Sequence, residues 1–159
     1  MGHAVGLSLA VAALAGCGGG VPSGTGVVPD GTTVSADTYL ATSSEAVAAA
    51  AELATAVTQF GAKPAPALLK ANADRLGNIA GRTRAAGERL NAVRLADGRL
   101  DRQRAQLALA YGVLSTAAGD ARAAAASGND TGYRSARIRV VAAIELARSR
   151  AAGTPIPSP

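Results

Sequence analysis

Apolar residues recur at intervals of three and four along four stretches of the chain, a pattern typical of helices that pack together. Turn-forming residues separate the stretches: Gly61 with the prolines that follow it, the Asp97-Gly98 pair, and Ser-Gly-Asn-Asp at 127–130. Ser35 is suited to cap the first stretch, because its side chain can accept a backbone N–H. The pattern predicts helices over residues 36–60, 66–96, 99–126 and 130–151.

Each predicted helix carries one stripe of mainly apolar residues, and the four stripes together form the expected core. The first holds Tyr39, Ser43, Ala46, Ala50, Leu53, Val57 and Phe60. The second holds Leu69, Asn72, Leu76, Ile79, Thr83, Ala86, Leu90 and Val93. The third holds Leu100, Arg104, Leu107, Tyr111, Leu114, Ala118, Ala121 and Ala125. The fourth holds Tyr133, Ala136, Val140, Ile144 and Ala147.

The composition favours an all-α fold. About a quarter of the residues are Ala, the strongest helix former, and aromatic residues make up only 3%. Only the short Gly-Thr-Thr-Val-Ser stretch at 31–35 resembles a strand. Because the connections are short, we expect an antiparallel up-down-up-down four-helix bundle. Gly77 and Gly81 either permit close helix approach or leave a soft segment, and the sequence does not choose between these alternatives.

The N-terminal residues combine a short apolar run with a small-residue motif. Residues 4–14 are apolar over about a dozen positions, fewer than the roughly 20 that a membrane-spanning helix needs. The run ends in Leu14-Ala15-Gly16-Cys17. This motif resembles the lipobox of bacterial lipoproteins, and the resemblance implies a diacylglycerol on the Cys17 sulfur and cleavage just before that residue. The alternative is a buried, inert cysteine after a short helix.

The resemblance divides the chain into four parts. These are a signal peptide at 1–16, a flexible tether at 17–35, the helical bundle at 36–152, and a disordered tail at 153–159. Residues 1–3 supply no Lys or Arg, which a signal peptide carries at its start, so we expect the true start to lie upstream. The implied location is the extracytoplasmic face of the cell membrane. The ratio of 14 Arg to two Lys is typical of GC-rich genomes such as those of actinobacteria.

The net charge of +5 is distributed unevenly. The first predicted helix carries three acidic residues and no basic one, and all 16 basic residues lie from Lys63 onward. This distribution indicates an anionic partner, either lipid or an envelope polymer, although a solvated basic face is the simpler interpretation. We expect no nucleic-acid binding, because no aromatic residues interleave with the basic ones. The candidate docking residues are Lys70, Arg84, Arg94, Arg137 and Arg148.

The sequence offers little for catalysis. The chain has a single histidine, His3, which lies in the expected signal peptide, and a single cysteine, Cys17, which would carry the lipid. A nucleophile paired with a base, or a His/Cys metal cluster, is therefore not expected, and neither is a cofactor. Asp97 and Asp101 could share a site, but the sequence favours structural roles for them: capping the third helix and pairing with Arg94, Arg102 or Arg104. We predict that the protein is not an enzyme.

Two classes of function remain open. The first is a noncatalytic, lipid-anchored envelope protein with a helical binding or structural module. The second is an accessory subunit whose protein partner completes the small, Ala-rich core.

Charges beside the core stripes predict how the first two helices align. Glu45 and Glu52 lie just before core positions of the first helix, and Arg75, Arg82 and Arg89 do so on the second. In an antiparallel hairpin these flanks face each other. A turn centred at Lys63-Pro64 then places Glu52 opposite Arg75 and Glu45 opposite Arg82.

Overall fold

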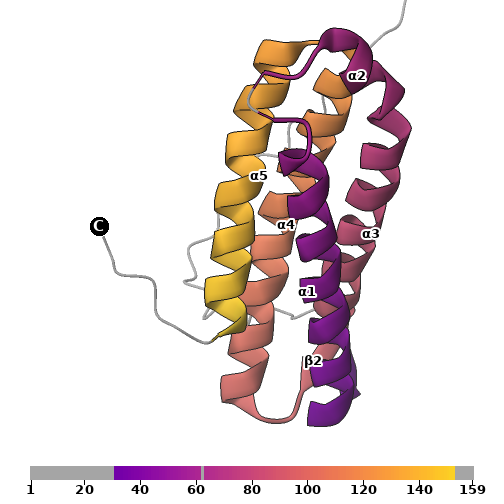
Figure 1. Cartoon of the computed structure of the whole chain (residues 1–159). Coiled ribbons are helices and arrows are strands. Elements are labelled where there is room, and N and C mark those ends of the chain that lie inside the picture. The colour runs from indigo at the N-terminus through magenta and orange to yellow at the C-terminus, as the bar shows by residue number, and fades with distance from the viewer. Residues whose placement is uncertain (1–30, 62, 153–159) are drawn as a thin grey trace, which may run out of the picture.

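The computed structural model describes residues 31–61 and 63–152, and this part of the chain is all-α (Figure 1). The predicted signal peptide, most of the tether, the C-terminal tail and Cys17 lie outside the described residues. The described elements are β1 (Thr32–Val34), α1 (Ala36–Thr58), α2 (Pro66–Ala71), α3 (Ala73–Ala92), β2 (Val93–Leu95), α4 (Gly98–Ser127) and α5 (Asp130–Ala151).

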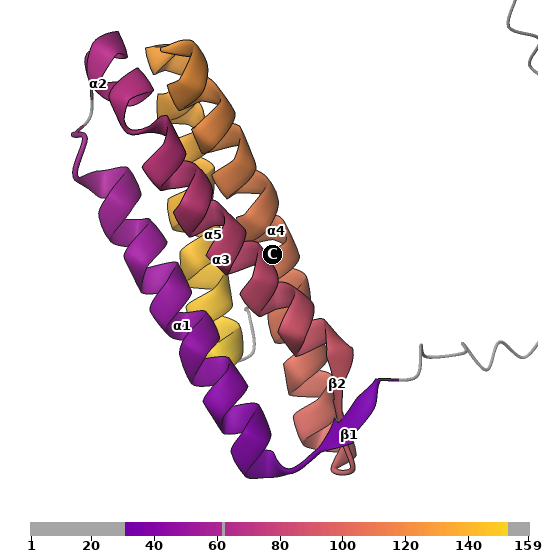
Figure 2. The ribbon, with the colours of Figure 1, turned by 90° about the vertical axis from the view of Figure 1, so that its right-hand side faces the viewer.

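The four long helices lie side by side, with α2 at one end and the two strands at the other (Figures 1 and 2). Helix α4 packs extensively against both α3 and α5, and α1 packs more closely against α3 than against α5. We call the end with β1 and β2 the strand end, and the end with α2 and the α4–α5 turn the distal end.

The core follows the predicted stripes closely. The stripe residues of α1, α3, α4 and α5 are buried with few exceptions, among which Ser43, Asn72, Val93 and Leu100 are only half-buried. Thr83 and Arg104 are the polar residues buried among the described ones. The buried apolar side chains form one continuous cluster, so the small Ala residues are packed together and not distributed among separate cores.

The predicted helix over 66–96 is wrong as a single element, because the chain forms α2, α3 and β2 there. The break between α2 and α3 falls at Asn72, whose φ of −111° and ψ of 4° lie outside the helical region. The Asn72 side chain donates from Nδ2 to the Leu68 carbonyl, so the residue closes α2 instead of continuing it. At the other end, Val93 is extended and α3 stops at Ala92.

The strand end corrects the expected boundary of the tether. Strand β1 pairs in parallel with β2, with Thr32 opposite Val93 and Val34 opposite Leu95. Gly31 lies beneath the Arg94 side chain: a Cβ at this position would stand 2.8 Å from Arg94 Cγ. Residues 31–35, which we assigned to the flexible tether, are therefore part of the folded unit, and the one strand-like stretch of the sequence forms the strand.

The remaining helix limits lie within one or two residues of their predicted positions, because the expected caps form. The Ser35 side chain accepts the Thr38 N–H at the start of α1. The Asp97 carboxylate accepts the N–H groups of Arg99 and Leu100 at the start of α4. These bonds hold the pKa of the Asp97 carboxyl below its usual value, with the Leu100 N–H as the largest contribution.

Helices α1 and α3 do pair through the predicted flanks, but the predicted register is wrong by one heptad. Arg82 bonds Glu52, and Arg89 Nη2 lies 3.3 Å from Glu45 Oε2. The predicted partner of Glu52 was Arg75, which lies one heptad closer to the turn. The sequence prediction counted the chain as one hairpin turning at Lys63-Pro64, whereas the real turn includes α2 and the break at Asn72.

Candidate functional site

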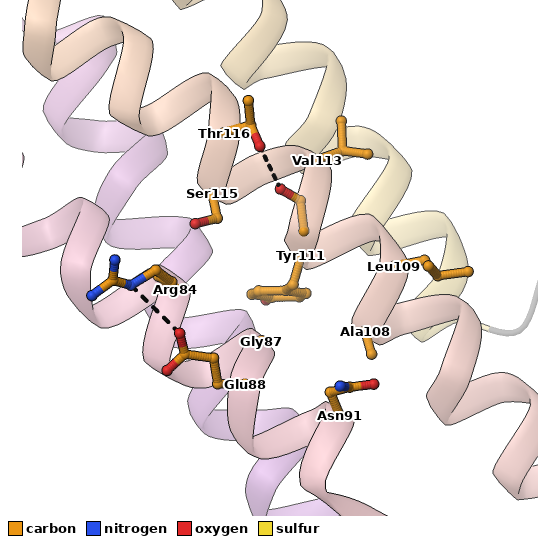
Figure 3. Close-up of a pocket in the computed structure, with 11 residues that line it drawn as sticks. Arg84, Gly87, Glu88, Asn91, Ala108, Leu109, Tyr111, Val113, Ser115 and Thr116 are labelled. Atoms are coloured by element: carbon orange, nitrogen blue, oxygen red, sulfur yellow. Dashed lines mark hydrogen bonds and ion pairs between the residues drawn. The ribbon is translucent and has the colours of Figure 1, made fainter. Parts of the chain in front are cut away.

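A groove runs along the outer surface between α3 and α4, and we call it the α3–α4 groove. Its half nearer the strand end encloses about 520 Å³ (Figure 3). Its other half extends toward the distal end and encloses about 440 Å³. The two halves meet at Arg84 and Ser115, which line both of them.

Glycines form much of the floor of the α3–α4 groove. Gly81, Gly112 and Gly119 line it, and a Cβ at any of them would meet nothing within 4 Å. At Gly87 the helices approach closely, since a Cβ there would stand 2.9 Å from the Tyr111 Cβ.

The sequence left two alternatives open for Gly77 and Gly81. In the structure Gly81 contributes open space, and a Cβ at Gly77 would stand 3.3 Å from Arg122 Nε, so Gly77 makes room for that side chain. The close approach of the helices is at Gly87.

The polar side chains of the groove come from both helices. Arg84 and Glu88 of α3 form an i,i+4 ion pair of 3.5 Å (Figure 3), in which each side chain is about 70% exposed. Across the groove, Thr116 Oγ1 donates to the Gly112 carbonyl of its own helix. An exposed ion pair of this kind contributes little stability, so the Arg84 guanidinium can exchange its partner for a bound ligand.

Tyr111 lies beneath the groove and not in it. Its side chain is 1% exposed, and burial raises the pKa of its hydroxyl to about 12. The hydroxyl therefore stays protonated near neutral pH. Among the described residues, no group of three or more His, Cys, Asp or Glu side chains is placed to hold a metal ion. The groove presents hydrogen-bonding groups and charged side chains to solvent.

A second groove, between α4 and α5, is more apolar. Val113, Ala117, Ala142 and Leu146 contribute to its lining, and the ion pair of Asp120 with Arg139 crosses it at 2.8 Å. Val113 borders both grooves and is 55% exposed. Leu109, one turn earlier on α4, is 74% exposed. The outer face of α4 therefore presents apolar side chains between two hollows.

The predicted docking residues do not gather on one face. Arg94 Nη1 donates to the carbonyls of Asn91 and Val93 at the strand end. Arg137 Nη1, by contrast, donates to the Gly61 carbonyl near the distal end. Both side chains therefore hold backbone carbonyls at opposite ends of the molecule.

The other three predicted docking residues also lie far apart. Arg84 is in the α3–α4 groove, Arg148 pairs with Glu145 at 2.7 Å on α5, and Lys70 lies on α2 at the distal end. Of the five, Lys70 and Arg137 share an end of the molecule, and Arg94 is at the other.

The Asp101–Arg104 pair is structural, as the sequence predicted. Arg104 is 3% exposed, its Nε lies 2.7 Å from Asp101 Oδ1, and its Nη1 donates to the Leu90 carbonyl. Asp101 also accepts the Leu95 N–H. The bond from Arg104 is the main reason that the pKa of the Asp101 carboxyl lies below its usual value. This network joins α4 to β2 and to the end of α3.

Comparison with known proteins adds no assignment. No protein-family model, curated protein or solved structure matches the chain. None of the helices in residues 31–61 and 63–152 has both the length and the apolar character of a membrane span.

Sequence reasoning missed the α3–α4 groove, although a signal was present. Gly112 and Gly119 are seven residues apart, so they share one helix face, and glycine is costly inside a helix. Reading them together with Gly77 and Gly81 would have indicated a hollow on two neighbouring helices.

Proposed function

We propose that this protein is a noncatalytic, lipid-anchored protein of the cell envelope whose helices form a binding module. The observation that carries the proposal is the Leu14-Ala15-Gly16-Cys17 motif after an apolar run of signal-peptide length. The proposed anchor is a lipid on Cys17, and the proposed location is the extracytoplasmic face of the cell membrane. The α3–α4 groove is the proposed contact surface.

The core supports a self-contained module. A continuous cluster of buried side chains runs through all four long helices, and large residues such as Leu53, Leu107 and Tyr133 are at most 1% exposed. We propose that these helices form an antiparallel up-down-up-down four-helix bundle that folds without a partner. A rigid module of this kind, joined to a lipid by residues 17–30, suits binding at a distance from the membrane.

The alternative function, an accessory subunit, has one observation in its favour. Leu109 and Val113 expose much of their apolar surface on the outer face of α4, next to the apolar α4–α5 groove. A protein partner covering this face would remove that surface from water, which is favourable at about 25 cal/mol per Å². Sedimentation of the purified chain over a range of concentrations tests for self-association through this surface.

The anchor is tested by metabolic labelling with an alkyne fatty acid in a bacterial host that processes lipoproteins. We expect label on the wild-type chain, recovery in the membrane fraction, and loss of both in Cys17→Ala, which should also accumulate as a longer precursor. Cys17→Ser is the matched control, because it keeps the size of the side chain but lacks the thiol. A wild-type chain that stays unlabelled and soluble would contradict the proposed anchor and location.

A further inference from the structure

Charge is distributed unevenly along the length of the molecule. In the middle, acidic and basic side chains neutralise one another, as in the pairs Glu52–Arg82 and Asp120–Arg139. At the distal end, besides Arg134, which pairs with Asp130, five basic residues come from five separate segments, and we call these five the distal basic cluster. They are Lys63 after α1, Lys70 of α2, Arg75 of α3, Arg122 of α4 and Arg137 of α5.

Few acidic residues oppose this cluster. Asp130 is engaged by Arg134 at 3.3 Å, and Asp74 stands in the first turn of α3, where the helix dipole favours a negative charge. Arg75 and Arg122 form no ion pair with any described residue. The shifted register explains why Arg75 has no acidic partner. Glu52, its predicted partner, bonds Arg82 instead, so no acid among the described residues faces Arg75 across the hairpin.

The fold holds three members of the cluster in place. The Lys70 side chain crosses the turn at Gly128, with its Cε 2.7 Å from where a Cβ of Gly128 would stand, and so places its charge at the C-terminal end of α4. Arg137 is held by its bond to the Gly61 carbonyl. Arg122 lies over Gly77, its Nε 3.3 Å from the position of a Cβ there.

We propose that the distal basic cluster, together with the adjoining half of the α3–α4 groove, binds a linear anionic polymer of the cell envelope. The recognised chemistry is a row of phosphate or carboxylate groups along a flexible chain. Arginine suits such groups because its planar guanidinium can donate two parallel hydrogen bonds. The setting of this site in the envelope rests on the proposed anchor, whereas binding itself does not.

The shape of the surface favours a chain over a flat bilayer. Arg122 and Arg84 line the groove, and Asp74 is the one acid among the described residues along this half of it. Asn78 and Ser115 add neutral hydrogen-bonding groups over the open floor at Gly119. A polymer can lie in this hollow, and a flat membrane surface cannot enter it. The cluster is also at the end opposite β1, through which the chain from Cys17 enters, and α4 alone, with 30 residues, separates the ends by about 45 Å.

The test measures binding of fluorescent inorganic polyphosphate to the full-length Cys17→Ala chain by anisotropy. The key variant, Arg75→Gln/Arg122→Gln, is compared with Arg99→Gln/Arg102→Gln, which removes the same charge at the strand end. Removing two arginines that contact the polymer should weaken binding about tenfold or more, since each positioned charge contributes on the order of 1 kcal/mol. The control should change affinity less than about threefold, through net charge alone.

Each other outcome overturns the proposal. Equal losses in the two variants would show that binding follows net charge and not the cluster. If the chain does not bind polyphosphate, the cluster is not a site for an anionic polymer. If it binds only vesicles containing phosphatidylglycerol, with the same dependence on Arg75 and Arg122, the ligand is a membrane surface and not a polymer. Because every protein in this assay lacks Cys17, a failure here leaves the labelling result untouched, and a failed anchor leaves the polymer result untouched.

Discussion

The strand end and the distal end use the same residue type in opposite ways. At the strand end, Arg104 is buried, bonds Asp101 and the Leu90 carbonyl, and joins three elements. At the distal end, Arg75 and Arg122 are exposed and have no acidic partner among the described residues. An arginine on a core stripe is committed to the fold, and an arginine on a flank without an opposing acid is available to a ligand.

The glycines along the α3–α4 groove show a second contrast. Gly87 lets α3 touch Tyr111, so the two helices are tightly joined at that point. Gly81, Gly112 and Gly119 meet nothing within 4 Å, so the groove is open beside them. The predictions below test both contrasts.

The largest expected effect is at Arg104. Arg104→Met should lower the free energy of unfolding by about 3 kcal/mol, because it leaves Asp101 and the Leu90 carbonyl without their partner in a largely dry site. Urea denaturation followed by circular dichroism measures the change. Arg102→Met, at an exposed position on the same helix, is the matched control and should stay within about 0.5 kcal/mol. Equal effects of the two substitutions would mean that Arg104 has no special role at the strand end.

Replacing a tightly packed glycine or an open one with Ala should change the stability of the fold in opposite directions. Gly87→Ala forces a Cβ to 2.9 Å from the Tyr111 Cβ and should destabilise the fold by about 1–3 kcal/mol. Gly119→Ala adds a methyl to open space and should stabilise it by up to about 1 kcal/mol, through helix propensity. Thermal melts of both variants measure these changes in stability. Destabilisation by Gly119→Ala would mean that the groove is not open at that position.

A smaller effect is expected at Tyr133, in the core toward the distal end. Its hydroxyl donates to the Val57 carbonyl, and its ring meets Phe60 edge-on with centroids 6.1 Å apart. Tyr133→Phe should cost about 1 kcal/mol at neutral pH. Burial raises the pKa of the Tyr133 hydroxyl to about 12, against the opposing charge of Arg137.

The raised pKa predicts the direction of the pH dependence. The folded state keeps the Tyr133 proton more tightly than the unfolded state does, so the associated stability is complete below pH 10 and is lost as the pH rises to about 12. Tyr133→Phe should make the decline of the melting temperature between pH 10 and 12 shallower. An unchanged slope would assign the alkaline loss to other groups, such as Tyr111, whose pKa is also raised to about 12.

The helices and the core were predictable because they depend on local periodicity. Each stripe repeats through several turns, so an error at one residue does not move the face that is buried, and even Arg104 was placed correctly on its stripe. The break at Asn72 and the β1–β2 pairing were not predictable in this way. A single side-chain bond from Asn72 to Leu68 ends α2, and residues 61 positions apart form the parallel strands.

The open α3–α4 groove could not be predicted from the sequence for a related reason. Spacing shows that Gly112 and Gly119 share a face of one helix, but whether that face meets a neighbour or solvent depends on how all four helices are arranged. The distal basic cluster could not be predicted either, because its members come from five segments that only the fold brings to one end.

The register of α1 against α3 gives the smallest and most specific effect. A double-mutant cycle on Glu52 and Arg82 should yield a coupling energy of about 0.2–1 kcal/mol, the range for exposed pairs, and it should fall at high salt. The same cycle on Glu52 and Arg75 should yield none, because the register leaves these residues a heptad apart. Coupling at Arg75 in place of Arg82 would restore the register expected from the sequence. It would also give Arg75 an acidic partner and so remove it from the distal basic cluster.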